Sequence, residues 1–354
     1  MIAIKQVTLN KVLELWKIRK FIFNMTQASL QKELFNFIKD ALPPNVSMAD
    51  EIAELLGLSY DSVYRRIRGE KPLPLDELKT LCEHFHLSLD QVLQLHSDKV
   101  LFTDLETNGS ITNFRQYLEG LLQQLQHFNS FNKKELRYLS KDVPVFHFFY
   151  FKELAAFKSF FWSRSILNEP EFENKNFSLK NFDAAEYFDL GQKILNKYND
   201  IPSTELWNYE SINSTILQIE YYRDAGIFET KEDLNAVLDS FDATLSHLQK
   251  QVEKGRKFMP NIGEAGYKAD LKFYINEIIL GNNSIVVNLD DTKTVFINHI
   301  VLKYISTTDK KFTEKAFNNF QNLISRSVLI SETGEKERNK FFKALRERVQ
   351  LCKK

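Results

Sequence analysis

The sequence predicts a mainly α-helical protein that ends in a small α+β module, and three observations support this prediction. The 354 residues include only 11 glycines and 8 prolines, which favours long helices over a turn-rich all-β fold. Apolar residues recur at helical spacing between residues 34 and 95, and again between residues 203 and 257. The clearest strand patterns lie later, between residues 285 and 331.

Residues 1–24 are predicted to be a basic N-terminal extension, because they carry five basic residues and one acidic residue among large apolar side chains. Two interpretations are open. The segment is an amphipathic arm that lies on a membrane or on DNA, or the start is misassigned and the chain begins at Met25. A signal peptide is not expected, since Lys17, Arg19 and Lys20 interrupt the apolar run.

A helix, a turn and a second helix form the centre of the next predicted domain, residues 25–96. The pattern is SMADEIAELLGLSYDSVYRRIRG, at residues 47–69. Ser47 followed by Asp50 is a capping-box pattern, in which side chains satisfy the amide groups that a helix leaves unpaired at its start. Gly57 lies where the chain turns, because glycine accepts the positive φ angle that ends many helices.

The second helix of this pair is predicted to have one buried and one exposed face. Ser59 caps it, and Val63 and Ile67, four residues apart, form its buried stripe. The other faces then carry the side chains that are free to contact a partner: Tyr60, Asp61, Ser62, Arg65 and Arg66.

Flanking segments complete a predicted unit of five helices. Upstream, apolar residues between positions 34 and 41 follow helical spacing until Pro43 and Pro44 stop the helix. Downstream, Pro74 suits the first turn of a fourth helix, and Ser88 caps a short last helix.

This order of helices, with GLS at residues 57–59, RGEKP at 68–72 and HLSLDQVL at 86–93, resembles the Xre family of lambda-repressor-like transcriptional regulators. The family's usual apolar residue three positions after Val63 is replaced here by Arg66. The resemblance implies a five-helix DNA-binding domain whose second paired helix enters the major groove of double-stranded DNA.

Docking in the family's manner would give each exposed residue a role. Arg66 would lie at the edge of the groove. Phosphates would be contacted by Arg68 and Lys71. Base edges would be approached by Tyr60, Asp61, Ser62 and Arg65.

Charge favours a different interpretation. Residues 30–95 hold 7 Lys and Arg against 11 Asp and Glu, whereas DNA-binding modules are usually basic. The alternative is a non-enzymatic interaction protein whose helix-turn-helix unit docks protein. Four of the seven basic residues gather within residues 65–71, however, which favours DNA binding.

Residues 97–110 are predicted to be a linker, and residues 111–260 a helical effector or oligomerisation region. Six apolar residues in this region repeat at heptad spacing, namely Leu234, Leu238, Phe241, Leu245, Leu248 and Val252. Two partners fit this heptad seam: the preceding helix, through Ile212, Ile216 and Ile219, or the seam of a second copy. A homodimer is expected, because it would match a two-fold operator.

Residues 261–354 are predicted to be a small α+β module. Ile285–Leu289 and Val295–His299 form a hairpin, and Val328–Ser331 a third strand. Helices are expected at residues 312–326 and 335–352. Sensory domains often have this shape, so a small-molecule or protein effector is expected, although the fold alone assigns no role.

The expected location is the cytoplasm, away from membranes. Cys82 and Cys352 are too few and too far apart for a disulfide framework, which indicates a reducing compartment. The phenylalanine-rich stretch at residues 143–162 contains Lys152 and Lys158, which are costly in lipid, so burial in a protein core is favoured. A hydrophobic ligand pocket in this stretch is the alternative to plain core.

No catalytic residue, cofactor or metal site is expected, so the protein is predicted not to be an enzyme. His84 and His86 do not share a helix face, and no neighbouring cysteine or carboxylate completes a zinc site. Gly263 and Gly266 lack the preceding strand and the lysine of a nucleotide-binding loop.

Overall fold

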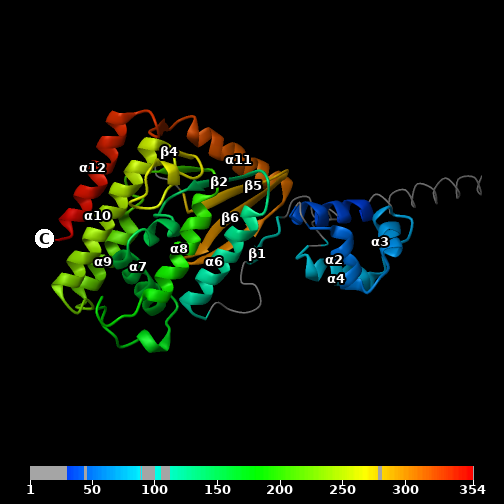
Figure 1. The fold of residues 1–354 in the computed structure, drawn as a ribbon, viewed down its shortest axis with the longest axis horizontal. Coiled ribbons are helices and arrows are strands. Elements are labelled where there is room, and N and C mark those ends of the chain that lie inside the picture. Colours follow the sequence, from blue (N-terminus) through cyan, green and yellow to red (C-terminus); the bar gives the residue numbers. More distant parts are fainter. Residues whose placement is uncertain are drawn as a thin grey trace, which may run out of the picture. The chain divides into compact units, whose positions relative to one another are not determined.

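A computed structural model describes residues 30–43, 46–87, 89, 100–104, 112–277 and 281–353. The chain divides into two compact units, Met1–Leu101 and Phe102–Lys354 (Figure 1). Within the described ranges, we find no helix with the length and apolar character that a membrane span requires.

The first unit is helical. A helix over residues 30–41 is followed by α2 (Met48–Leu56), α3 (Tyr60–Ile67) and α4 (Leu75–His84). Each contributes to one small core, formed by Leu34, Phe35, Ile38, Ala49, Ile52, Val63 and Leu81. The described part of this unit therefore has four helices and not the five predicted. The expected last helix, from Ser88, lies outside the described residues except for Leu89.

The second unit is built on an eight-stranded mixed sheet of order β1-β7-β6-β5-β2-β3-β4-β8. Strands β2, β3 and β4 are parallel to one another, and every other pairing is antiparallel. The strands are β1 (Thr103–Asp104), β2 (Lys134–Leu139), β3 (Ser203–Trp207), β4 (Leu271–Ile275), β5 (Ser284–Leu289), β6 (Thr292–Ile300), β7 (Lys303–Thr307) and β8 (Val328–Leu329).

Helices cover both faces of this sheet (Figure 1). The longer helices are α6 (Phe114–Asn129), α7 (Lys152–Phe161), α8 (Ala185–Asn199), α9 (Asn213–Asp224), α10 (Lys231–Lys254), α11 (Lys310–Ile324) and α12 (Glu335–Leu351). Short turns of helix lie at η1 (Val145–Phe149), η2 (Trp162–Ile166, a π-helix), η3 (Pro170–Phe172) and η4 (Glu264–Gly266).

Alternation along the strands assigns the two faces. Trp207 of β3 and Phe273 of β4 point into the large core, which also contains residues of α6, α7, α8, α10 and α12. Their neighbours Leu206 and Tyr274 point to the opposite face, where they pack with Phe320 of α11. Among the described helices, α11 covers the second face, and most of the buried apolar side chains lie on the first.

The prediction of a mainly α chain with a separate C-terminal α+β module is wrong. Strands β2 and β3 lie in the region predicted to be helical, yet they pair within the same sheet as the later strands. β1 lies in the predicted linker and pairs with β7. The sequence of β3 does not predict a strand, because all five of its residues are buried and apolar and polar residues do not alternate along it.

Other local predictions are confirmed. β5 and β6 form the expected hairpin, and Asp290 lies at its turn with a φ of 47°, as short hairpin loops require. β8, α11 and α12 lie within two residues of the segments expected.

The heptad seam of α10 is filled within the chain. All six of its apolar residues are at most 6% exposed, and α10 packs against α7 and α12. Ile212, Ile216 and Ile219 belong to the same core. The seam therefore has no free face for a second copy.

The phenylalanine-rich stretch is also core, and it encloses a lysine. Lys158 is 2% exposed, and its ammonium lies 4.3 Å from the ring centre of Phe148 and 4.5 Å from that of Trp162. Its Nζ donates a hydrogen bond to Gln218 Oε1 at 2.5 Å. Burial lowers the pKa of Lys158 to about 7.

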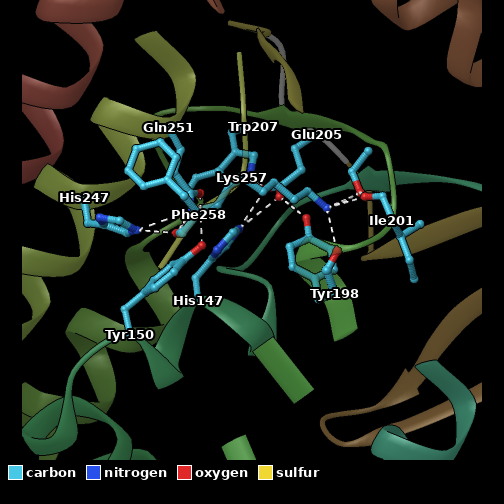
Figure 2. Close-up of polar contacts among 11 residues, drawn as sticks. His147, Tyr150, Tyr198, Ile201, Glu205, Trp207, His247, Gln251, Lys257 and Phe258 are labelled. Atoms are coloured by element: carbon cyan, nitrogen blue, oxygen red, sulfur yellow. Dashed lines mark hydrogen bonds and ion pairs between the residues drawn. The ribbon is translucent and has the colours of Figure 1, made fainter. Parts of the chain in front are cut away.

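A cluster of buried polar side chains surrounds Glu205 of β3 (Figure 2). The carboxylate accepts hydrogen bonds from His147 Nε2 at 3.0 Å, from Trp207 Nε1 at 2.8 Å and from the Tyr198 hydroxyl. Burial opposes ionisation of Glu205, but His147 and these donors outweigh it and hold the pKa of the carboxyl below its ordinary value. The cluster ties β3 to η1 and α8.

Lys257 completes this cluster from the segment after α10 (Figure 2). Its Nζ donates to the carbonyls of Tyr198 and Ile201, at 3.1 Å and 2.8 Å, and to Ser203 Oγ at 2.6 Å. Burial lowers the pKa of Lys257 well below its ordinary value, although the nearby Glu205 opposes this. Since these donors and acceptors are buried, we expect them to hold this part of the core in one arrangement.

Candidate nucleic-acid interface

The turn between α2 and α3 is built by the residues that the sequence predicts. Ser47 accepts a hydrogen bond from the Asp50 amide and caps α2. Gly57 ends that helix with a φ of 62°, in the left-handed region that favours glycine. Ser59 then accepts from the amide of Ser62 and caps α3. Both predicted caps and the predicted turn are confirmed.

Packing against α2 sets the orientation of α3. Val63 is fully buried and lies in one core with Ile52 of α2, while Ile67 is half-buried at the edge of that core. Val63 points inward, whereas the side chains at positions 60, 61, 64 and 65 are exposed.

Arg66 does not face outward, which corrects its predicted position. It is 2% exposed, and its guanidinium forms a two-bond ion pair with Glu77 of α4, at 2.5 Å and 2.6 Å. Its Nη1 also donates to the carbonyl of Ser62 at 3.1 Å. A charged side chain can replace the family's apolar residue here because all of these contacts satisfy it. Arg66 therefore holds α3 against α4 and is not available to a groove edge.

The exposed face of α3 carries two tyrosines, an acid and an arginine. Tyr60 and Tyr64 are 58% and 48% exposed, and Asp61 and Arg65 are also exposed. Ser62 is half-buried, and its hydroxyl pairs with that of Ser59 at 3.1 Å. Tyr64 is not among the predicted contact residues. Its spacing of four from Tyr60 nevertheless indicates that the two tyrosines lie on the same helix face.

Arg68 and Lys71 lie just after α3 and are exposed, as predicted. Arg68 is bound to Glu70 through two hydrogen bonds, Nε to Oε1 at 2.6 Å and Nη2 to Oε2 at 3.0 Å. Glu70 also lies 4.0 Å from Nε of Arg65. The hydrogen bond with Glu70 raises the pKa of Arg68, and the same bond lowers the pKa of Glu70.

Gln31 of the first helix braces this segment. Its Nε2 donates to the carbonyls of Arg66 and Lys71, at 2.7 Å and 2.8 Å. Its Oε1 accepts from the Leu73 amide at 3.0 Å. The end of α3 and the residues after it are therefore tied to the first helix by three hydrogen bonds from one side chain. No sequence pattern predicts this contact, because the partners of Gln31 are backbone groups about 40 residues away along the chain.

The exposed face suits the edges of base pairs. An arginine can donate two hydrogen bonds to guanine, and apolar ring surface can contact the methyl group of thymine. Basic side chains next to such a helix can contact phosphates. Among the described residues, His, Cys, Asp and Glu side chains form no group of three that could hold a metal ion.

Comparison with known proteins identifies this part of the chain. No curated protein and no solved structure matches the chain. The family described as the BetR domain matches residues 38–108, a range that contains α2, the turn at Gly57, α3 and α4. Residues 38–108 are thus a BetR domain, a DNA-binding domain of the helix-turn-helix type.

Proposed function

We propose that the protein is a sequence-specific transcriptional regulator of the Xre-like kind that binds double-stranded DNA through α3. In this proposal Tyr60, Asp61, Ser62 and Arg65 approach base edges, and Tyr64 joins them. Arg68 and Lys71 contact phosphates. Arg66 has a positioning role, because its buried ion pair sets how α3 lies on α4.

The observation that carries this proposal is the agreement between the BetR match and the exposure of α3. The matched range contains a capped helix pair, and Arg65 stands on the outward face of its second helix. Four of the seven basic residues between positions 30 and 95 lie in residues 65–71. Three of these four, Arg65, Arg68 and Lys71, are exposed.

We infer that residues 102–354 form an effector or oligomerisation unit that responds to a small molecule or a protein. A homodimer remains part of the proposal, because a two-fold operator would match it. Since the α10 seam is buried, a dimer would form through another surface. A cytoplasmic location is also part of the proposal, because Cys82 and Cys352 are too few and too far apart in sequence for a disulfide framework.

Fluorescence anisotropy with a labelled duplex of mixed sequence tests DNA binding. We expect the association constant to fall steeply with salt, because each phosphate contact releases counterions. Once a preferred site is known, Arg65→Ala should reduce discrimination at one base pair by about 1–3 kcal/mol. Lys79→Ala, a change of an exposed lysine on α4, is the control with the same loss of charge.

An unchanged preference in Arg65→Ala would show that Arg65 does not contact a base. Failure of the protein to bind any duplex at low salt would favour the alternative, in which the unit docks protein. The acidic balance of residues 30–95 is the observation behind that alternative.

A further inference from the structure

Glu70 stands between the two exposed arginines of the proposed DNA-binding face. Its carboxylate occupies the guanidinium fork of Arg68 through two hydrogen bonds, at 2.6 Å and 3.0 Å. It lies 4.0 Å from Nε of Arg65. One acid thus partly neutralises two of the three exposed basic residues that we expect to meet DNA.

The backbone fixes this acid in place. The Glu70 amide donates to the carbonyl of Arg65 at 2.8 Å, and Gly69 makes the turn before it with a φ of 74°. Gln31 holds the carbonyls of Arg66 and Lys71 on either side. The carboxylate is therefore delivered to Arg68 by the fold of this segment.

A carboxylate in this position has the chemistry of a phosphate competitor. Phosphate and carboxylate both accept two parallel hydrogen bonds from a guanidinium. Both side chains of the pair are about half exposed, at 53% for Arg68 and 48% for Glu70. A phosphate from solution can therefore reach the fork, and the surface pair itself is weak enough to exchange.

We propose that Glu70 is a built-in competitor for DNA phosphate, which Arg68 must release before it can contact the DNA backbone. This inference rests on the proposed DNA-binding function. Its consequence is that Glu70 lowers affinity for every DNA sequence equally, because a phosphate contact carries no sequence information. Weaker binding to non-specific DNA leaves recognition more dependent on the base contacts of α3.

The test compares the full-length protein with Glu70→Gln by anisotropy on a labelled mixed-sequence duplex over a range of salt. We expect Glu70→Gln to bind about 3- to 10-fold more tightly at low salt, since Arg68 is freed and a charge that repels phosphate is removed. The slope of log association constant against log salt should steepen by up to about 0.9, the value for one full phosphate contact, because Glu70 no longer competes with phosphate for Arg68.

Glu83→Gln is the matched control. Glu83 is an exposed acid of α4 with a side-chain exposure of 68%, and its replacement changes the net charge by the same amount. We expect its affinity and salt slope to stay close to those of the original protein.

A double variant isolates the role of Arg68. In the Arg68→Ala background, Glu70→Gln should gain less affinity than it does in the original protein, because only the repelling charge and the longer contact with Arg65 are then removed. An equal gain with and without Arg68 would overturn the competitor proposal, as would unchanged affinity and slope in Glu70→Gln itself. Neither result would affect DNA binding by the original protein. Absence of binding by all variants would instead overturn the proposed function, and the competitor with it.

Discussion

Replacement of Lys158 by methionine tests how the core of the second unit tolerates a buried amine. The pKa of Lys158 is lowered by burial from 10.5 to about 7. The unfolded chain therefore binds a proton that the folded chain does not bind between these two pH values. The contribution of Lys158 to stability is therefore most favourable above pH 10.5, falls as the pH drops towards 7, and is constant below that pH.

The size of the effect follows from this difference in pKa. At about 1.36 kcal/mol per pH unit, the full difference is about 5 kcal/mol. The aromatic rings of Phe148 and Trp162 favour the charged amine and offset part of this, so we expect about 2–5 kcal/mol. The unfolding free energy of Lys158→Met minus that of the original protein should therefore increase by this amount as the pH falls from 10.5 to 7.

Urea unfolding at several pH values measures this gain. Trp162 and Trp207 both lie in the core of the second unit, so tryptophan fluorescence reports its unfolding. Lys152→Met, an exposed lysine of the same helix, is the control and should show a difference that does not depend on pH. If the Lys158→Met difference is also independent of pH, the amine has an ordinary pKa and the reasoning is refuted.

Two further predictions concern the first unit. Glu77→Ala leaves the buried guanidinium of Arg66 without its partner, so we expect a loss of about 2–4 kcal/mol, measured as faster amide hydrogen exchange in α3. Glu54→Ala, an exposed acid of α2, is its control, and equal exchange in the two variants would contradict the role of the ion pair. Gly57→Ala should cost about 1 kcal/mol in thermal unfolding, because an added Cβ meets no neighbour and only the positive φ opposes it. A loss near zero would mean that the turn adopts another conformation.

The helix pair could be predicted from sequence because its signals are local. Ser47, Gly57 and Ser59 each act on backbone groups within a few residues. The predicted exposed position of Arg66 is wrong, because arginine is normally a surface residue and local sequence gives no reason to bury it. Its partner Glu77 comes from the next helix, and no spacing rule connects the two.

The sheet of the second unit could not be predicted because its determinants are distant in sequence. β3 is buried on both faces, yet it contains Glu205. An acidic residue in so short a segment does not predict a buried strand from local sequence. The groups that make this acid tolerable are His147, which is 58 residues away, and the donors around it. β5 and β6 were recognised because a hairpin and its turn are adjacent in the chain.

Selection of bound sequences from a random DNA pool by the full-length protein, at low and at raised salt, tests the central claim most directly. We predict enrichment of a defined sequence whose recovery persists at raised salt, and loss of preference at one position when the selection is repeated with Arg65→Ala. A pool that remains random at every salt concentration would contradict the assignment of α3 as a helix that reads DNA.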